Sequence, residues 1–168
     1  PLGINVMAQL QSHWTTTGGA CEGEAFLDFS GTRSPIVPGV TEVFWDKFVA
    51  RTGVWPIYTA WGAYESTYVL RDAIQRAGTL NVDGVVTELE KTDAKAGVDP
   101  GAITSNFKFT GYHDVFCSKS DVGPGWYTGY VRPFVVQWQA GRKEVVSPIN
   151  TGYPRMCALP NYPSTAPG

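Results

Sequence analysis

Residues 58–78 read YTAWGAYESTYVLRDAIQRAG and form the longest regular pattern in the sequence. Small or apolar side chains, together with one threonine, recur there every three or four positions, at Ala60, Tyr64, Thr67, Leu70, Ile74 and Ala77. Such spacing is typical of a helix that buries one side, and it predicts a helix from about Thr59 to Ala77. Gly78 follows at the position where glycine commonly ends a helix. The stretch therefore predicts a long helix that packs against a core along one stripe.

Shorter elements are predicted on both sides of this helix. Residues 42–50 form one further helix with Thr41 as its cap, and a third helix ends near residue 91 and is capped by Asn81 or Asp83. Strands are predicted at residues 4–7, 24–29, 102–103 and 107–109, and in a hairpin of residues 131–138 and 143–146. This order of strands and helices indicates an α/β fold.

Composition and charge exclude two classes of protein. The chain has 168 residues, of which 43% are hydrophobic and 17% charged, so it can bury a core. Its 13 Lys and Arg residues face 15 Asp and Glu residues, for a net charge of −2, and no basic run occurs. Binding to nucleic acid through its phosphates needs a concentrated cationic surface, so we expect no nucleic-acid partner. No apolar run reaches the ~18 residues that predict a membrane-spanning helix.

Motifs of common enzyme classes are missing from the sequence. It contains no G-x-S-x-G, no Walker loop, no G-x-G-x-x-G and no H-E-x-x-H. Of the two histidines, His13 has no acid near it in sequence, and His113 and Asp114 are neighbours, whose side chains usually point apart. We therefore expect a protein that is not an enzyme, with no catalytic residues, no metal site and no cofactor.

The three cysteines, Cys21, Cys117 and Cys157, have no metal-binding spacing. Cys117 and Cys157 both lie in loop-like sequence rich in Gly, Pro and Ser. A disulfide between them would close a loop of 40 residues and would stabilise the fold by about 3–4 kcal/mol. Three free thiols are the alternative, because connectivity cannot be read from a sequence.

Aromatic residues gather beside predicted turns. Trp14, Tyr58 and Trp61 each lie at a junction where a strand or loop leads into a helix. Ligands of open α/β sheets collect at the carboxyl ends of strands, so these rings could line an apolar ligand cleft. Ordinary packing in the core is the alternative for each of them.

A series of short motifs resembles one known family. In chain order they are GINV at 3–6, WTTTGG at 14–19, CEG at 21–23, YTAWGAYES at 58–66, VVTELEKT at 85–92, YHDV at 112–115, GPG at 123–125 and VQWQAGRK at 136–143. Each motif alone is weak, but the series occurs in order over roughly residues 3–148. In this order the motifs resemble the second half of a type I periplasmic binding protein, in the group of ABC-transporter receptors that bind branched-chain amino acids.

The resemblance implies part of a fold with two α/β lobes: a partial two-lobe, Rossmann-like sandwich with a C-terminal β-hairpin. Residues 1–28 would belong to the C-terminal lobe, residues 29–130 to the N-terminal lobe and residues 131–148 again to the C-terminal lobe, followed by a surface tail at 149–168. The first part of both lobes would be missing. Since the chain also begins at Pro1, we expect a piece of a longer protein, whose N-terminal half could be present as a separate chain.

The resemblance also implies a function. Members of the family bind a small molecule between their lobes, and the closed form docks on an ABC permease in the membrane. We therefore expect the solute-binding component of an ABC transporter, in the periplasm or outside the cell. The alternative is a ligand-sensing receptor domain of the same fold, which transports nothing.

Position within the family implies the ligand-binding residues Asn5, Met7, Gln9, Tyr58, Thr59 and Trp61. Asn5 and Gln9 would orient polar ligand atoms, whereas Met7 and Trp61 would supply apolar contacts or pack between the lobes. Amino-acid binders need a carboxylate beside the ligand's ammonium, because a buried charge without a partner is costly. Residues 8–13 contain no acid. We therefore expect a small amino-acid-like ligand of low cationic character, such as an amide, a carboxylic acid or an aromatic metabolite.

Overall fold

The computed structural model describes residues 2–3, 5–28, 32–33, 37–109, 113, 115 and 134–147. Its elements, in chain order, are β1 Leu2–Gly3, the 3-10 helix η1 Met7–Gln9, α1 Ser12–Thr16, β2 Ala25–Asp28, α2 Thr41–Thr52, α3 Tyr58–Ala77, α4 Val82–Glu90, β3 Asp93–Ala94, β4 Phe107–Lys108, β5 Phe134–Gln139 and β6 Arg142–Ser147. The predicted surface tail at 149–168 lies outside the described residues, as do Cys117 and Cys157. Cys21 is buried and has a free thiol.

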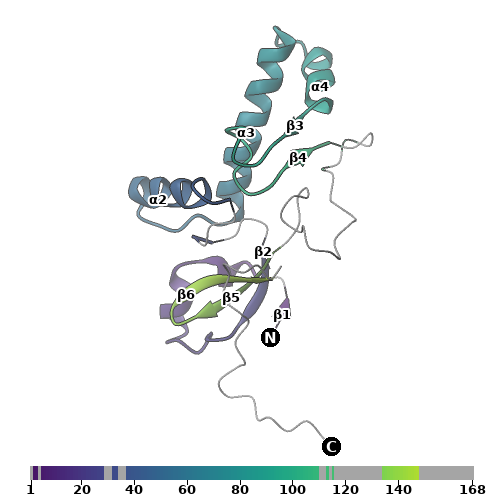
Figure 1. The fold of residues 1–168 in the computed structure, drawn as a ribbon. Helices are drawn as coiled ribbons and strands as arrows, with labels where there is room; N and C mark the ends of the chain where they lie inside the picture. The colour runs from purple at the N-terminus through teal and green to yellow at the C-terminus, as the bar shows by residue number, and fades with distance from the viewer. Residues whose placement is uncertain are drawn as a thin grey trace, which may run out of the picture.

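Four strands from both ends of the described chain form one sheet, in the order β1-β2-β5-β6 (Figure 1). β1 runs parallel to β2, whereas β2 pairs with β5 and β5 with β6 in antiparallel fashion. Together with η1 and α1 we call this the sheet unit. Its core contains Phe26, Val136, Trp138 and Val145, all fully buried, and Ala8 from η1.

The helical unit consists of α2, α3, α4 and the β3–β4 hairpin, and Figure 1 shows α3 and α4 side by side. Its core gathers around Trp45 of α2, Trp61 of α3 and Ile103. Trp55, in the segment between α2 and α3, packs against the cores of both units. Its ring stacks on Trp138 with 6.0 Å between centroids and lies 5.6 Å from the ring of Trp45. The two units therefore meet at Trp55. Their assignment to lobes of a larger protein stays a prediction.

The three predicted helices are confirmed as α2, α3 and α4. Asn81 caps α4, because its side-chain oxygen accepts a hydrogen bond of 3.1 Å from the Gly84 N–H. Gly53 and Gly78 end α2 and α3 in the left-handed conformation, with φ of 75° and 61°. The cap predicted at Thr41 is wrong: Val40 is the cap residue of α2.

The stripe predicted for α3 is right only in part. Tyr64 packs against the core and Ala60, Ile74 and Ala77 are partly buried, but the most buried positions are rotated by about one residue. The helix buries Trp61, Val69 and Ala73, whereas Leu70 is 46% exposed. The reason is the segment 101–104, which crosses α3 on the side of Trp61 and Val69. Glu65 lies on this side too, and its carboxyl group holds the backbone of that segment.

Two predicted strands are absent from the described structure. Ile4 lies outside the described residues; at residues 5–7, the Asn5 side chain accepts hydrogen bonds from the N–H groups of Met7 (3.1 Å) and Ala8 (3.4 Å), which turns the chain into η1 instead of extending it. At residues 102–103, Ile103 is bonded through its backbone to side chains and not to a neighbouring strand. Its N–H donates to Glu65 Oε1, and its carbonyl accepts from Thr41 Oγ1. Within the described residues, no helix is long and apolar enough to cross a membrane.

The contact between α3 and the segment 101–104 predicts an effect of substitution at Gly101. A Cβ atom at this position would lie 2.7 Å from Cβ of Tyr68, so Gly101→Ala must push the segment away from the helix. We expect the free energy of unfolding, measured by urea titration, to fall by about 1–3 kcal/mol. The control is Gly62→Ala on α3, where an added Cβ meets nothing within 4 Å and helix propensity should add up to about 1 kcal/mol. Equal stability of the two variants would contradict the prediction.

Candidate functional site

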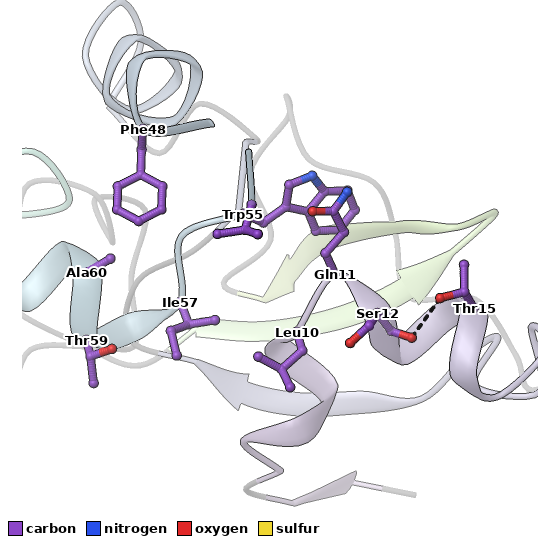
Figure 2. A pocket seen from close by; sticks show the side chains of 10 residues that line it. Leu10, Gln11, Ser12, Thr15, Phe48, Trp55, Ile57, Thr59 and Ala60 are labelled. Atoms are coloured by element: carbon purple, nitrogen blue, oxygen red, sulfur yellow. Dashed lines mark hydrogen bonds between the residues drawn. The ribbon is translucent and has the colours of Figure 1, made fainter. Parts of the chain in front are cut away.

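A cavity of about 710 Å³ opens where the sheet unit and the helical unit meet, and we call it the inter-unit cavity. The sheet unit contributes Leu10, Gln11, Ser12 and Thr15 to its lining. The helical unit contributes Phe48, Val54, Trp55, Ile57, Thr59 and Ala60. Figure 2 shows the first set on the η1–α1 segment and the second on α2, α3 and the segment between them. A molecule in this cavity would therefore contact both units.

The lining combines apolar surface with neutral hydrogen-bonding groups. Leucine, isoleucine, phenylalanine and tryptophan side chains form most of the wall, and one amide and three hydroxyl groups are added to it. The Thr15 hydroxyl donates to the Ser12 carbonyl at 3.0 Å (Figure 2). None of the described lining residues carries a charge. This arrangement suits an apolar molecule with an uncharged polar group, or with an anionic group that hydroxyls can bind.

Gln9 fastens the two units together beside the inter-unit cavity. Its side chain is 3% exposed, and its Oε1 accepts a hydrogen bond of 3.3 Å from the backbone N–H of Tyr58, the first residue of α3. Its carbonyl oxygen accepts a hydrogen bond of 3.0 Å from Nζ of Lys143. The preceding carbonyl, of Ala8, accepts a hydrogen bond from the indole of Trp138 at 2.9 Å. These bonds hold η1 between β5, β6 and the start of α3.

Lys143 on β6 is a buried lysine at this junction. Its side chain lies against the rings of Trp45 and Trp55, with Nζ 5.7 Å and 6.0 Å from their centroids. Burial lowers the pKa of Lys143 to about 8, although the negative charge of Asp28 acts in the opposite direction. Sequence reasoning missed this residue. The available signal was strand alternation, since Lys143 is two residues from the buried Val145 and shares its face of β6.

The structure distributes the predicted site residues over several places. Thr59 lines the inter-unit cavity, whereas Tyr58 and Trp61 line a second cavity of about 310 Å³ beside α3. The Asn5 amide donates to Glu24 Oε1 at 2.8 Å. Met7 is 61% exposed and lines neither cavity.

Asn5 belongs to a polar cluster that the sequence did not reveal. Glu24, next to β2, accepts from Asn5 through one carboxyl oxygen and contacts His13 Nε2 at 2.8 Å through the other. The side chains of His13 and Glu24 are mostly buried, with exposed fractions of 15% and 16%. The cluster ties η1 and α1 to the sheet, and so fixes the wall of the inter-unit cavity that the sheet unit contributes.

Comparison with known proteins shows that the fold of this chain is similar to that of a solved structure. No family model and no curated protein sequence matches the chain. Among solved structures, the leucine-binding protein LivK from Thermotoga maritima matches 80% of this chain with a TM-score of 0.57 and 18% identity. The match covers 33% of LivK, so the chain spans about a third of the length of that protein. The likeness confirms that this chain has a mixed α/β fold similar to that of a type I periplasmic binding protein.

Proposed function

We propose that this chain is part of a solute-binding protein that holds a small molecule in the inter-unit cavity. One observation carries the proposal: a single open cavity takes its walls from both structural units. Its volume of about 710 Å³ lies in the range of small-molecule sites. The likeness to a protein that binds leucine supports a solute of similar size.

The ligand class follows from the lining. Leu10, Phe48 and Trp55 supply apolar surface, and Gln11 and Thr59 supply an amide and a hydroxyl. An ammonium group would lose its water here without gaining a counter-charge from the described lining, which is unfavourable. We therefore propose an amino-acid-sized amide or carboxylic acid with an apolar body.

Binding would act through the junction between the units. A ligand that contacts both units favours the arrangement in which they are closest, and so shifts the population of conformations. The contacts that would have to adjust are those of Trp55 and of Gln9 with Tyr58. The proposal includes an extracytoplasmic location, an ABC permease that accepts the closed form, and an N-terminal half of the receptor as partner.

The proposal is tested by filling the cavity. Ala60→Trp places an indole into the inter-unit cavity, whereas Ala63→Trp, one turn of α3 away, places it on an exposed position that lines neither cavity. Calorimetric titration uses 4-methylpentanamide, 4-methylpentanoic acid and L-leucine, which share one apolar body. We expect the amide or the acid to bind at least tenfold more tightly than leucine. We also expect Ala60→Trp to weaken that binding at least tenfold, and Ala63→Trp less than twofold.

Two results would contradict the proposal. Sub-micromolar binding of leucine, with neither the amide nor the acid bound, would show that the ligand class is wrong. Equal affinities of the Ala60→Trp and Ala63→Trp variants for a bound ligand would show that the ligand lies elsewhere.

A further inference from the structure

The second cavity, which we call the α3 cavity, has a volume of about 310 Å³ and lies along the first three turns of α3. Its described lining consists of Tyr58, Trp61, Gly62, Glu65, Ser66, Val69, Thr104, Phe107 and Val115. None of these residues lines the inter-unit cavity. The two cavities are therefore separate sites on either side of the start of α3.

Trp61 lines the α3 cavity and carries a hydrogen-bond donor that no described group uses. Its side chain is 1% exposed, and its ring packs on Phe44 with 4.4 Å between centroids. Its indole Nε1 is buried and has no hydrogen-bond partner in the part of the chain that the structure describes. Buried donors in folded proteins are almost always paired, and an acceptor placed in the cavity next to the indole would satisfy this one.

Glu65 brings a buried acceptor to the same cavity. Its Oε1 accepts three hydrogen bonds, from Ile103 N at 3.1 Å, Thr104 N at 3.0 Å and Thr104 Oγ1 at 2.9 Å. Its Oε2 accepts none from the described residues. The three bonds fix the carboxyl group and leave one oxygen for a ligand. Burial raises the pKa of Glu65, and a cation beside Oε2 would act in the opposite direction.

Gly62 lines the α3 cavity without filling it. It follows Trp61 in the interior of α3, and a Cβ atom built on it would meet nothing within 4 Å. Glycine is unfavourable in a helix interior, and no close packing requires it here. Any larger side chain at this position would occupy space beside Glu65 and Trp61.

We propose that the α3 cavity is a second binding site, for a small primary ammonium compound that also carries a hydroxyl or carbonyl oxygen. The ammonium group binds Glu65 Oε2, and the oxygen accepts the indole N–H of Trp61. Aromatic rings in the lining, such as those of Tyr58 and Phe107, favour a cation by attraction to their faces. This ligand differs in charge from the one proposed for the inter-unit cavity.

Calorimetric titration of the full chain with three probes of similar size tests the ligand class. Ethanolamine has both groups, propylamine lacks the oxygen, and propan-1-ol lacks the ammonium. We expect ethanolamine to bind at least tenfold more tightly than either of the others. No binding of ethanolamine at millimolar concentration, or equal binding of all three probes, would overturn the proposal.

Variants locate the site. Gly62→Leu fills the α3 cavity while favouring the helix, and Glu65→Gln retains an oxygen for the three hydrogen bonds but removes the charge. We expect each to weaken ethanolamine binding at least tenfold. The control Ala63→Leu on the exposed side of α3 should change it less than twofold, as should Ala60→Trp in the inter-unit cavity. If Gly62→Leu binds ethanolamine as tightly as wild type does, the proposal is wrong. If Ala60→Trp weakens ethanolamine binding while Gly62→Leu does not, ethanolamine binds in the inter-unit cavity, and the α3 site fails while the proposed solute site does not.

Discussion

Replacing Trp138 by alanine is expected to lower the free energy of unfolding by about 3–5 kcal/mol. Trp138 is fully buried at the centre of the sheet unit, and its ring lies 5.9 Å from that of Trp14 and 6.0 Å from that of Trp55. Alanine would leave a cavity among these rings. It would also remove the donor that the Ala8 carbonyl uses, so that a buried acceptor loses its partner.

Two control variants separate these contributions. Trp138→Phe retains a ring and loses only the indole donor and part of the volume, so its loss of stability should be smaller than that of Trp138→Ala. Leu80→Ala removes a large side chain that is 80% exposed, and its effect should stay within about 0.5 kcal/mol. The measurement is urea unfolding followed by circular dichroism. A loss below 1 kcal/mol for Trp138→Ala would show that the ring is not the centre of the core.

The second large effect is a dependence of stability on pH that comes from Lys143. Its pKa is about 8 in the folded chain, against 10.5 for an unburied lysine. Between these values the unfolded chain binds a proton that the folded chain lacks, so the free energy of unfolding rises as the pH increases. A pKa difference of one unit corresponds to about 1.4 kcal/mol. We therefore expect the free energy of unfolding to rise by about 2–3 kcal/mol between pH 7 and pH 10.

The test compares wild type with Lys143→Met, whose side chain is one atom shorter, cannot titrate and lacks the hydrogen bond to the Gln9 carbonyl. Between pH 7 and pH 10, the free energy of unfolding of wild type should rise by about 2–3 kcal/mol relative to that of Lys143→Met. Lys47→Met, at an exposed position of α2, should show no such trend relative to wild type. The range ends at pH 10 because the raised pKa of Tyr64, about 12, opposes the effect above that pH. Parallel curves for wild type and Lys143→Met would refute the assignment.

The parts of the fold that sequence predicted well depend on local interactions. Asn81 and Gly78 mark helix ends through hydrogen bonds and backbone angles within a few residues. The β5–β6 hairpin was also predicted from local sequence, because Ala140 and Gly141 form its turn. Their φ angles are 49° and 77°, in the positive-φ region that glycine adopts readily. Such features need no knowledge of the rest of the chain.

The parts that sequence missed depend on residues far apart in the chain. Ile103 has the composition of a strand residue, yet its backbone groups bind Thr41 and Glu65, 62 and 38 positions away. The same contact decides which side of α3 is buried. Thr59, at the start of α3, was among the residues that the family resemblance implied, and it lines the inter-unit cavity. The opposite wall, formed by residues 10–15, could not be predicted, because it is fixed by the contact of His13 with Glu24 across the sheet unit.

The order of strands in the sheet has a consequence for biosynthesis. β2 has no antiparallel neighbour until β5 exists, since Ala25 pairs with Gln137, more than a hundred residues later. The helical unit, by contrast, lies entirely between them and is held by contacts that are closer in sequence. Because non-local pairing is slow and domains form as the chain emerges, we expect the helices to assemble on the ribosome first. The sheet would then close only once the β5–β6 hairpin has been synthesised.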